Sequence, residues 1–148
     1  MDDETAMAMA LDEARAALAH GDVPVGAVVL AGGRVLARRH NERERLADPT
    51  AHAELLALRD AAAMLGRWRL DGATMVVTLE PCPMCAGALV NARIARVVFG
   101  AADPRAGSCG SLYNLSCDPR LNHGYELTSG VREPECAELL TAFFRDRR

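Results

Sequence analysis

Two short segments that lie far apart in the sequence both carry side chains that bind metal ions. The first, His52 to Glu54, reads His-Ala-Glu, and the second, Pro81 to Cys85, reads Pro-Cys-Pro-Met-Cys. One imidazole and two thiolates are three ligands for zinc, and three ligands leave the fourth tetrahedral position open for water. A fold that uses all three ligands must bring the two segments together at one point.

A Cys-x-x-Cys pair has other common uses. By itself it is most often half of a structural zinc site or a redox pair. A redox pair leaves His52 and Glu54 unexplained. A structural zinc needs a fourth ligand, and the remaining candidates contain no second close pair: His20, His40, His123, Cys109, Cys117 and Cys136. We therefore interpret His52, Cys82 and Cys85 as ligands of one catalytic zinc ion. Glu54 is then free to transfer protons beside the metal.

The size and composition of the chain indicate a single domain over residues 1–148. A chain of 148 residues can bury a substantial core, and its hydrophobic and charged fractions are those of an ordered, soluble protein. The N-terminal residues are acidic, and no apolar run is long enough to cross a bilayer, which predicts a cytoplasmic protein with no membrane partner. An odd number of cysteines, five, also favours a reducing compartment. We expect Cys109 and Cys117 to be small buried residues.

The net charge of -3 excludes nucleic-acid binding through a global positive field. Any nucleic-acid partner must therefore be met by a local patch. All 17 basic residues are arginine, which binds phosphate through a fork of N–H donors. For any single arginine, ordinary solvated surface charge is the favoured interpretation. The arginines gather in two places: Arg34, Arg38, Arg39, Arg43 and Arg45, and then Arg145, Arg147 and Arg148.

The hydrophobic pattern predicts alternating helices and strands. Apolar residues at helical spacing indicate an opening helix over 5–20, and two short runs at 25–30 and 34–38 form a hairpin around Gly32-Gly33. Strands at 74–79 and 96–99 flank a helix at 84–94, and this order implies a right-handed crossover with parallel pairing. A last strand is expected at 125–127. The final helix starts near Pro134 with an apolar face of Cys136, Leu139, Leu140, Phe143 and Phe144.

These elements predict an α/β fold with three layers: a central mixed five-stranded sheet with helices on both faces. The spacing of the motifs also places them within it. Residues i and i+2 of a regular helix point about 200° apart, so His52 and Glu54 can converge only where a helix begins near His52. Cys82 and Cys85, at i and i+3, lie together at the start of the next helix. There, unpaired amides and the helix dipole favour the thiolate.

The combination of His-x-Glu with Pro-Cys-x-x-Cys is the known signature of zinc nucleobase deaminases. Beyond this motif, the sequence resembles the bacterial tRNA adenosine deaminase (TadA) family of the cytidine deaminase-like superfamily. The resemblance covers nearly the whole chain. It is carried by Val23–Ala27, Asn41, Asp48–Glu54, Thr78–Ala88, Arg96–Ala101, Gly110–Leu112, Asn122–His123 and Phe143–Arg145.

The resemblance implies an enzyme that converts the wobble adenosine of a tRNA anticodon to inosine by hydrolysis. It implies a homodimer with one zinc ion per subunit and a CMP/dCMP deaminase-type domain. It also implies that Asn41 contacts the nucleotide, that Ala53, Val25 and Leu79 line the base pocket, and that Asp103 lies beside the anticodon. Asp103 can equally be a simple turn residue before Pro104.

Two other functions remain open from the sequence. One is a free-base or nucleoside deaminase of the same superfamily, such as a guanine or cytosine deaminase, which needs a closed pocket. A tRNA enzyme instead needs an open site for a flipped base, and arginines at 145, 147 and 148 of the final helix favour that interpretation by offering contacts to phosphates. The other is a non-catalytic zinc domain that binds RNA, in which Glu54 has no use.

Overall fold

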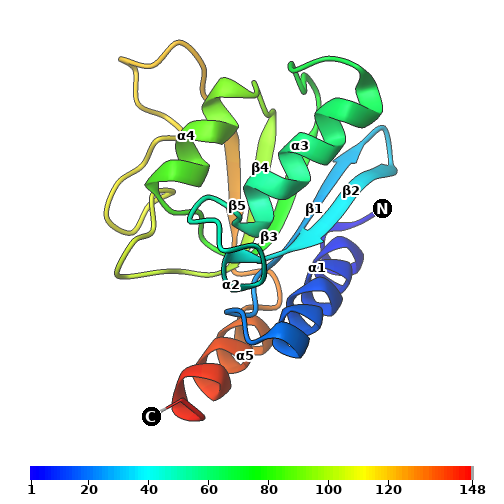
Figure 1. Ribbon diagram of the computed structural model, residues 1–148. Helices are drawn as coiled ribbons and strands as arrows, with labels where there is room; N and C mark the ends of the chain where they lie inside the picture. The colour runs from blue at the N-terminus through cyan, green and yellow to red at the C-terminus, as the bar shows by residue number, and fades with distance from the viewer. Residues whose placement is uncertain (148) are drawn as a thin grey trace.

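Five strands form one mixed sheet. The computed structural model of the protein describes residues 1–147, and its strands are β1 (Gly26–Ala31), β2 (Arg34–His40), β3 (Thr74–Leu79), β4 (Arg96–Ala101) and β5 (Glu126–Ser129). Their order across the sheet is β2-β1-β3-β4-β5. Strand β1 pairs antiparallel with both of its neighbours, whereas β3, β4 and β5 are parallel. The carboxyl ends of the parallel strands therefore share one edge (Figure 1).

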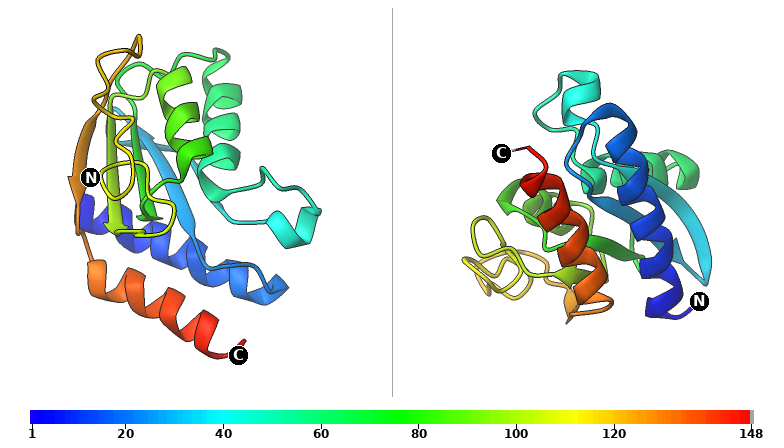
Figure 2. Two further views of the ribbon diagram at one scale, coloured as in Figure 1. Left: turned by 90° about the vertical axis from the view of Figure 1, so that its left-hand side faces the viewer. Right: turned by 90° about the horizontal axis from the view of Figure 1, so that it is seen from below.

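Helices cover both faces of this sheet. They are α1 (Asp3–Ala17), the 3-10 turn η1 (Leu18–His20), α2 (Arg43–Leu46), α3 (Ala53–Leu65), α4 (Pro83–Asn91) and α5 (Glu133–Arg145). Helices α3 and α4 lie on one face, and α1 and α5 lie on the other (Figures 1 and 2). This arrangement confirms the predicted three-layer α/β/α fold. Among residues 1–147, no helix combines the length and the apolar surface that crossing a bilayer requires.

The central strands β1, β3 and β4 are largely apolar because their middle residues are buried on both sides of the sheet. Alternate residues of β1 belong to two different cores: Ala27 and Val29 pack under α3 and α4, whereas Val28 packs under α1 and α5. Strands β3 and β4 alternate in the same way, with Val76 and Val98 on the α1 and α5 side. A continuous apolar run is the expected pattern for strands that are covered on both faces.

Several element boundaries differ from the prediction by a few residues, and one short helix was not predicted. Helix α4 ends at Asn91, because Arg93 adopts a left-handed conformation with φ of 61°, and the fully buried Ile94 lies outside the helix. The last strand begins at Glu126 and extends to Ser129. The short helix α2 was not predicted, since a single turn is too short to show a hydrophobic period.

Two predictions of buried side chains are wrong. In α5, Cys136 and Phe143 are buried, but Phe144 is 50% exposed. Successive residues of a helix point about 100° apart, so Phe143 and Phe144 cannot both face the sheet. Cys117 is exposed because it lies in the irregular surface segment between β4 and β5, whereas Cys109 is buried as expected.

Helix α1 crosses β1 at a distance that only glycine permits. A Cβ atom on Gly26 would lie 1.9 Å from the carbonyl oxygen of Ala10 and 2.6 Å from the amide nitrogen of Ala14. Both are backbone atoms of a helix and cannot move aside independently. The separation between this helix and the sheet is therefore set by the absence of a side chain at Gly26.

We expect Gly26→Ala to lower the free energy of unfolding by roughly 2–3 kcal/mol, because the added methyl group forces α1 away from the sheet. Gly87→Ala is the matched control: Gly87 lies in α4, and nothing within 4 Å would meet its Cβ. Alanine there should be neutral or stabilising by about 0.5–1 kcal/mol. Urea unfolding of both variants measures the difference, and equal midpoints would refute the close-contact explanation.

Candidate active site

The two motif segments meet where α3 and α4 begin. His52 is the N-cap of α3 and has an extended backbone, with φ of -73° and ψ of 151°. Cys82 is the N-cap of α4, with φ of -75° and ψ of 174°, and Pro83 opens that helix. The prediction that a regular helix starts near His52 is thus confirmed. Because His52 precedes the helix, its ring can turn toward the same point as side chains of the first turn.

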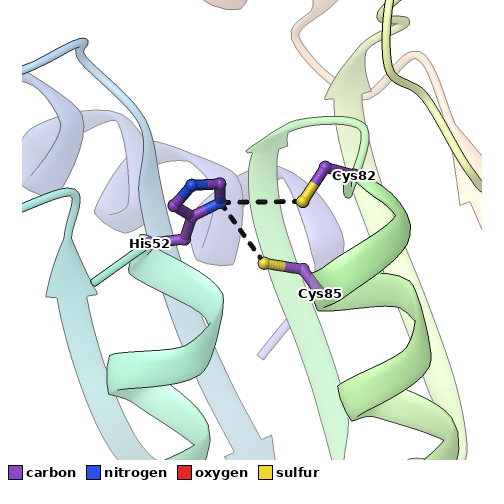
Figure 3. A group of neighbouring side chains, drawn as sticks. All are labelled: His52, Cys82 and Cys85. Carbon is purple, nitrogen blue, oxygen red and sulfur yellow. Dashed lines mark hydrogen bonds between the residues drawn. The ribbon is translucent and has the colours of Figure 1, made fainter. Parts of the chain in front are cut away.

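Three potential ligand atoms converge at this point (Figure 3). The Nδ1 atom of His52 lies 3.7 Å from the Sγ atom of Cys82 and 3.6 Å from that of Cys85. All three atoms lie within 4.8 Å of one another, a grouping that can hold a metal ion. Nitrogen and sulfur ligands of one tetrahedral zinc ion lie about 3.5–3.6 Å apart, given bond lengths of about 2.0–2.1 and 2.3 Å. The residues present therefore fit zinc in both chemistry and spacing.

The electrostatics of the three ligands favour a bound cation. A hydrogen bond from Cys85 lowers the pKa of Cys82 to about 4, so that Cys82 is a thiolate at neutral pH. The same contact, together with burial, raises the pKa of Cys85. The pKa of His52 is raised, mainly by its contact with Cys82. The site thus concentrates negative charge on sulfur, which a divalent cation neutralises better than protons do.

Glu54 lies in the first turn of α3, two residues after the histidine. Its side chain is only 4% exposed, and burial raises its pKa, an effect that the nearby His52 partly offsets. A carboxyl group with a raised pKa is well suited to accept and return a proton near neutral pH. The first turn of α3 contains Glu54 as its acidic residue, and the first turn of α4 contains none. Glu54 is therefore the carboxyl group that these two turns place beside the ligand atoms.

The chain is similar to known deaminases over nearly its whole length. The family described as MafB19-like deaminase matches residues 1–148. The tRNA-specific adenosine deaminase of Bacillus subtilis (strain 168) is 52% identical to this chain over 146 residues, which are 99% of this chain and 91% of that protein. The chain belongs to the family of tRNA-specific adenosine deaminases. This membership agrees with the family that the sequence resembled.

Two solved structures are similar to this deaminase. One, reported for A-to-I editing by tRNA:A34 deaminases at the wobble position of transfer RNA, is 46% identical, with a TM-score of 0.89 over 92% of this chain and 99% of that one. The other is a guanine deaminase from Bacillus subtilis, 37% identical, with a TM-score of 0.68 over 75% of this chain and 71% of that one. The deaminase therefore has the cytidine deaminase-like fold that was predicted.

The residues that the resemblance assigned to the nucleotide surround the same sheet edge of the deaminase. Val25 and Ala53 are buried, and Leu79 is half-buried at the end of β3. The side-chain amide of Asn41 donates to the carbonyl of Val23 and accepts from the amide of Arg43, so it fixes the loop after β2. Their contacts with a nucleotide stay predictions.

Asp103 acts as a turn residue, the alternative that the sequence left open. Its carboxylate accepts hydrogen bonds from the backbone amides of Arg105 and Ala106. It also lines a groove with a volume of about 770 Å³ between the 101–105 segment and α5. Leu79, Phe144 and Arg147 are on the walls of this groove. The exposed Phe144 thus belongs to a surface hollow rather than to the core.

The two arginine groups differ in how they are neutralised. Around β2, Arg38 pairs with Glu13, while Arg39 and Arg45 both pair with Glu42. At the end of α5, the guanidinium of Arg147 lies 3.7 Å from the ring centre of Phe143, and Arg145 is exposed with its nearest carboxylate, Asp146, at 3.8 Å. Arg148 lies outside the described residues. The α5 group therefore presents more uncompensated positive charge than the β2 group.

Glu80 is a site residue that sequence reasoning missed. It lies between β3 and Cys82 and is 2% exposed. Its carboxylate accepts hydrogen bonds from the amides of Asp103, Cys109 and Ser111 and from the Ser111 hydroxyl. Burial by itself would raise the pKa of Glu80, but the Ser111 hydroxyl and the three amides hold it below its ordinary value. A charged residue directly after a largely apolar strand was the available signal.

The contacts of Glu80 hold the 103–111 segment against the cysteine-bearing loop. The amide of Ser108 also donates to the carbonyl of Pro81, the residue next to Cys82. A Cβ atom on Gly107 would lie 2.4 Å from the carboxyl carbon of Glu80, so the segment can close over this carboxylate only with glycine at 107. Through its contacts with the 103–111 segment, Glu80 therefore helps to position the loop that leads into α4.

We expect Glu80→Gln to lower the free energy of unfolding at pH 7 by about 2–4 kcal/mol, because the amide cannot accept all the hydrogen bonds that the carboxylate accepts. Since the pKa of Glu80 is lowered by folding, its stabilisation is present above the unfolded value of about 4.3 and is lost as the pH falls through the folded value. The difference from the parent protein should shrink accordingly in denaturant titrations from pH 7 to pH 3. Glu138→Gln, at an exposed carboxylate of α5, is the control. A pH-independent difference would contradict this role.

Proposed function

We propose that this protein is a zinc-dependent enzyme that hydrolyses adenosine to inosine at the wobble position of a tRNA anticodon. The observation that carries the proposal is the convergence of His52, Cys82 and Cys85 on one point beside the buried Glu54. Three ligands leave one tetrahedral position open, as a catalytic site requires. The relative of 52% identity that is named a tRNA-specific adenosine deaminase supports the substrate.

In this proposal, His52, Cys82 and Cys85 hold the metal and Glu54 moves the protons. When bound there, zinc supplies the Lewis acidity that makes water nucleophilic near neutral pH. Glu54 accepts a proton from the attacking water and delivers protons to the adenine ring nitrogen and to the departing amino group. Adenosine and water are thereby converted to inosine and ammonia. The raised pKa of Glu54 suits both halves of this transfer.

A surface groove that includes Leu79 and Asp103 supports a nucleic-acid substrate over a free base. The groove of about 770 Å³ runs between Asp103 and α5, and Arg105 and Arg147 border it. A base that is flipped out of a single-stranded loop needs room for its flanking nucleotides and phosphates. The guanine deaminase, whose structure matches over 75% of this chain, is less similar than the tRNA:A34 deaminase.

The assembly and location are proposed on the same basis. We propose a single zinc-binding deaminase domain over residues 1–148, supported by the family match over that range. The family resemblance implies a homodimer with one zinc ion per subunit, acting in the cytoplasm where tRNA is found. Asn41, Val25, Ala53 and Leu79 are proposed to contact the target nucleotide.

The function can be tested on an anticodon stem-loop that carries a wobble adenosine. We expect the zinc-loaded protein to form inosine in this RNA and to leave free adenosine, adenine, guanine and cytosine unchanged. Glu54→Gln should keep its zinc and lose about 10²- to 10⁴-fold or more in kcat, because the proton carrier is absent. Deamination of guanine with an untouched stem-loop would overturn the substrate, and near-normal turnover by Glu54→Gln would overturn the role of Glu54.

We expect the double variant Arg145→Gln and Arg147→Gln to bind the stem-loop more weakly and with a flatter salt dependence. The slope of log Kd against log salt should fall by about 0.7–0.9 for each phosphate that the variant no longer neutralises. Arg69→Gln is the control, since Arg69 follows α3, whose C-terminal end points away from α5 (Figure 1). Fluorescence anisotropy over a salt series measures the slopes, and identical slopes would remove both arginines from the interface.

A further inference from the structure

A second group of potential metal ligands lies outside the deaminase site. His20, His40 and Glu42 each offer one atom, and these atoms all lie within 4.8 Å of one another. His20 is the last residue of η1, His40 is the last residue of β2, and Glu42 is the N-cap of α2. The group therefore joins three elements, and none of its residues belongs to the first group.

The two imidazoles face each other through their Nε2 atoms. These nitrogens are 3.1 Å apart, and the rings are stacked with their centres 5.2 Å apart. Each Nδ1 atom contacts a carboxylate: that of His20 lies 2.6 Å from Asp22, and that of His40 lies 3.0 Å from Glu13. An ionised carboxylate only accepts hydrogen bonds, so both Nδ1 atoms are donors.

This hydrogen bonding fixes the tautomer of both rings. When each neutral ring carries its proton on Nδ1, each Nε2 presents a lone pair toward the other. Two lone pairs at 3.1 Å repel unless a positively charged species lies between them. A carboxylate on the second ring nitrogen is the usual support for a metal-binding histidine, because it orients the ring and makes Nε2 more basic.

The supporting carboxylate of Asp22 is itself firmly held. The side chain of Asp22 is fully buried, which alone would raise its pKa, but the amides of Glu44 and Arg45 and the ring of His20 lower it. Those two amides lie 2.6 and 3.1 Å from its oxygens. Asp22 is therefore an ionised carboxylate that holds the ring of His20 in place without a bound metal ion.

Glu42 completes the group as an oxygen ligand. One of its carboxylate oxygens lies 3.7 Å from Nε2 of His40, and the other accepts a hydrogen bond of 2.9 Å from Arg39. Two nitrogen ligands of one tetrahedral zinc ion are expected about 3.3–3.4 Å apart, so separations of 3.1 and 3.7 Å bracket the required spacing. Arg45 lies 3.5 Å from the Glu42 oxygen that faces His40, and its side chain is exposed enough to move aside when an ion binds.

We propose that His20, His40 and Glu42 form a second metal site, which binds a divalent transition-metal ion such as Zn²⁺, Co²⁺ or Ni²⁺ through two nitrogens and one oxygen. Imidazole and carboxylate ligands of this kind suit those ions. The site is partly open, with 17% and 16% of the two histidine side chains exposed, so that an ion can enter and water can complete its coordination.

The position of this second metal site would let a bound ion fix the conformation of the loop that carries Asn41. Asn41 lies between His40 and Glu42, and its amide already bridges Val23 and Arg43. A metal ion bound here joins the end of η1 to the end of β2 and the start of α2. It would therefore hold the loop that carries Asn41 in one conformation, without taking part in the deamination itself.

The test is the metal content of tag-free protein after dialysis against buffered zinc. We expect two equivalents of zinc per chain in the parent protein and one in His20→Gln or His40→Gln. His123→Gln, which removes a histidine from neither group, is the matched control and should keep two. A parent protein that saturates at one equivalent overturns the proposal. So does a second equivalent that persists in both the His20 and the His40 variant.

Cobalt substitution distinguishes the two sites by their spectra and does not depend on activity. Thiolate ligands give an intense charge-transfer band in the near ultraviolet, whereas nitrogen and oxygen ligands give only weak visible bands. We expect Cys82→Ser to bind one cobalt ion with weak visible bands, and His20→Gln to bind one with the thiolate band. A Cys82→Ser protein that binds no cobalt would overturn the second site and leave the deaminase assignment untouched.

Discussion

The structure depends on two helix N-termini that face each other at the carboxyl edge of the parallel strands. Each of them leaves unpaired backbone amides and the positive end of a helix dipole at the same point, which favours the thiolate form of cysteine. Cys82 and Cys85 exploit this field from α4, while His52 enters from the N-cap of α3. The sheet supplies the alignment, because the right-handed crossover from β3 through α4 to β4 fixes where α4 can begin. The geometry of this edge of the sheet thus brings the three ligand side chains to one point.

Two buried carboxylates, those of Glu80 and Asp22, fix the loops around the deaminase site and the proposed second metal site. Glu80 anchors a segment more than twenty residues away in the sequence, and Gly107 lets that segment approach without a side chain. Near the start of α2, the carboxylate of Asp22 contacts the ring of His20 and accepts a hydrogen bond from the backbone amide of Glu44 in α2. In each case a buried carboxylate is stabilised by backbone amides rather than by arginine. Such a carboxylate fixes several backbone positions at once, so it sets the shape of a loop and not just one contact.

The sequence was sufficient for the elements whose burial is regular. Strands β3 and β4 and the start of α3 were predicted because an apolar period and the angular spacing of His52 and Glu54 are local properties. Residues whose partners are distant in sequence could not be placed. Glu80 was visible only as a charge after an apolar strand, and His20 and His40 were considered singly as spare ligands because nothing local shows that their rings stack. The exposure of Phe144 and Cys117 depends on how α5 is rotated and where a long loop runs, and neither follows from hydrophobicity.

The arginines of β2 have a consequence for the behaviour of the molecule at high concentration. Strand β2 is an edge of the sheet, so one row of its amides and carbonyls has no partner strand among the residues that the structure describes. An exposed edge of this kind is a template for aggregation through strand addition. Arg34, Arg38 and Arg39 lie along that edge, and a second copy of the chain that extended the sheet there would have to desolvate Arg34 and the ion pairs of Arg38 with Glu13 and of Arg39 with Glu42. Charged side chains on an edge strand are one of the ways in which proteins disfavour strand addition, and β2 carries them.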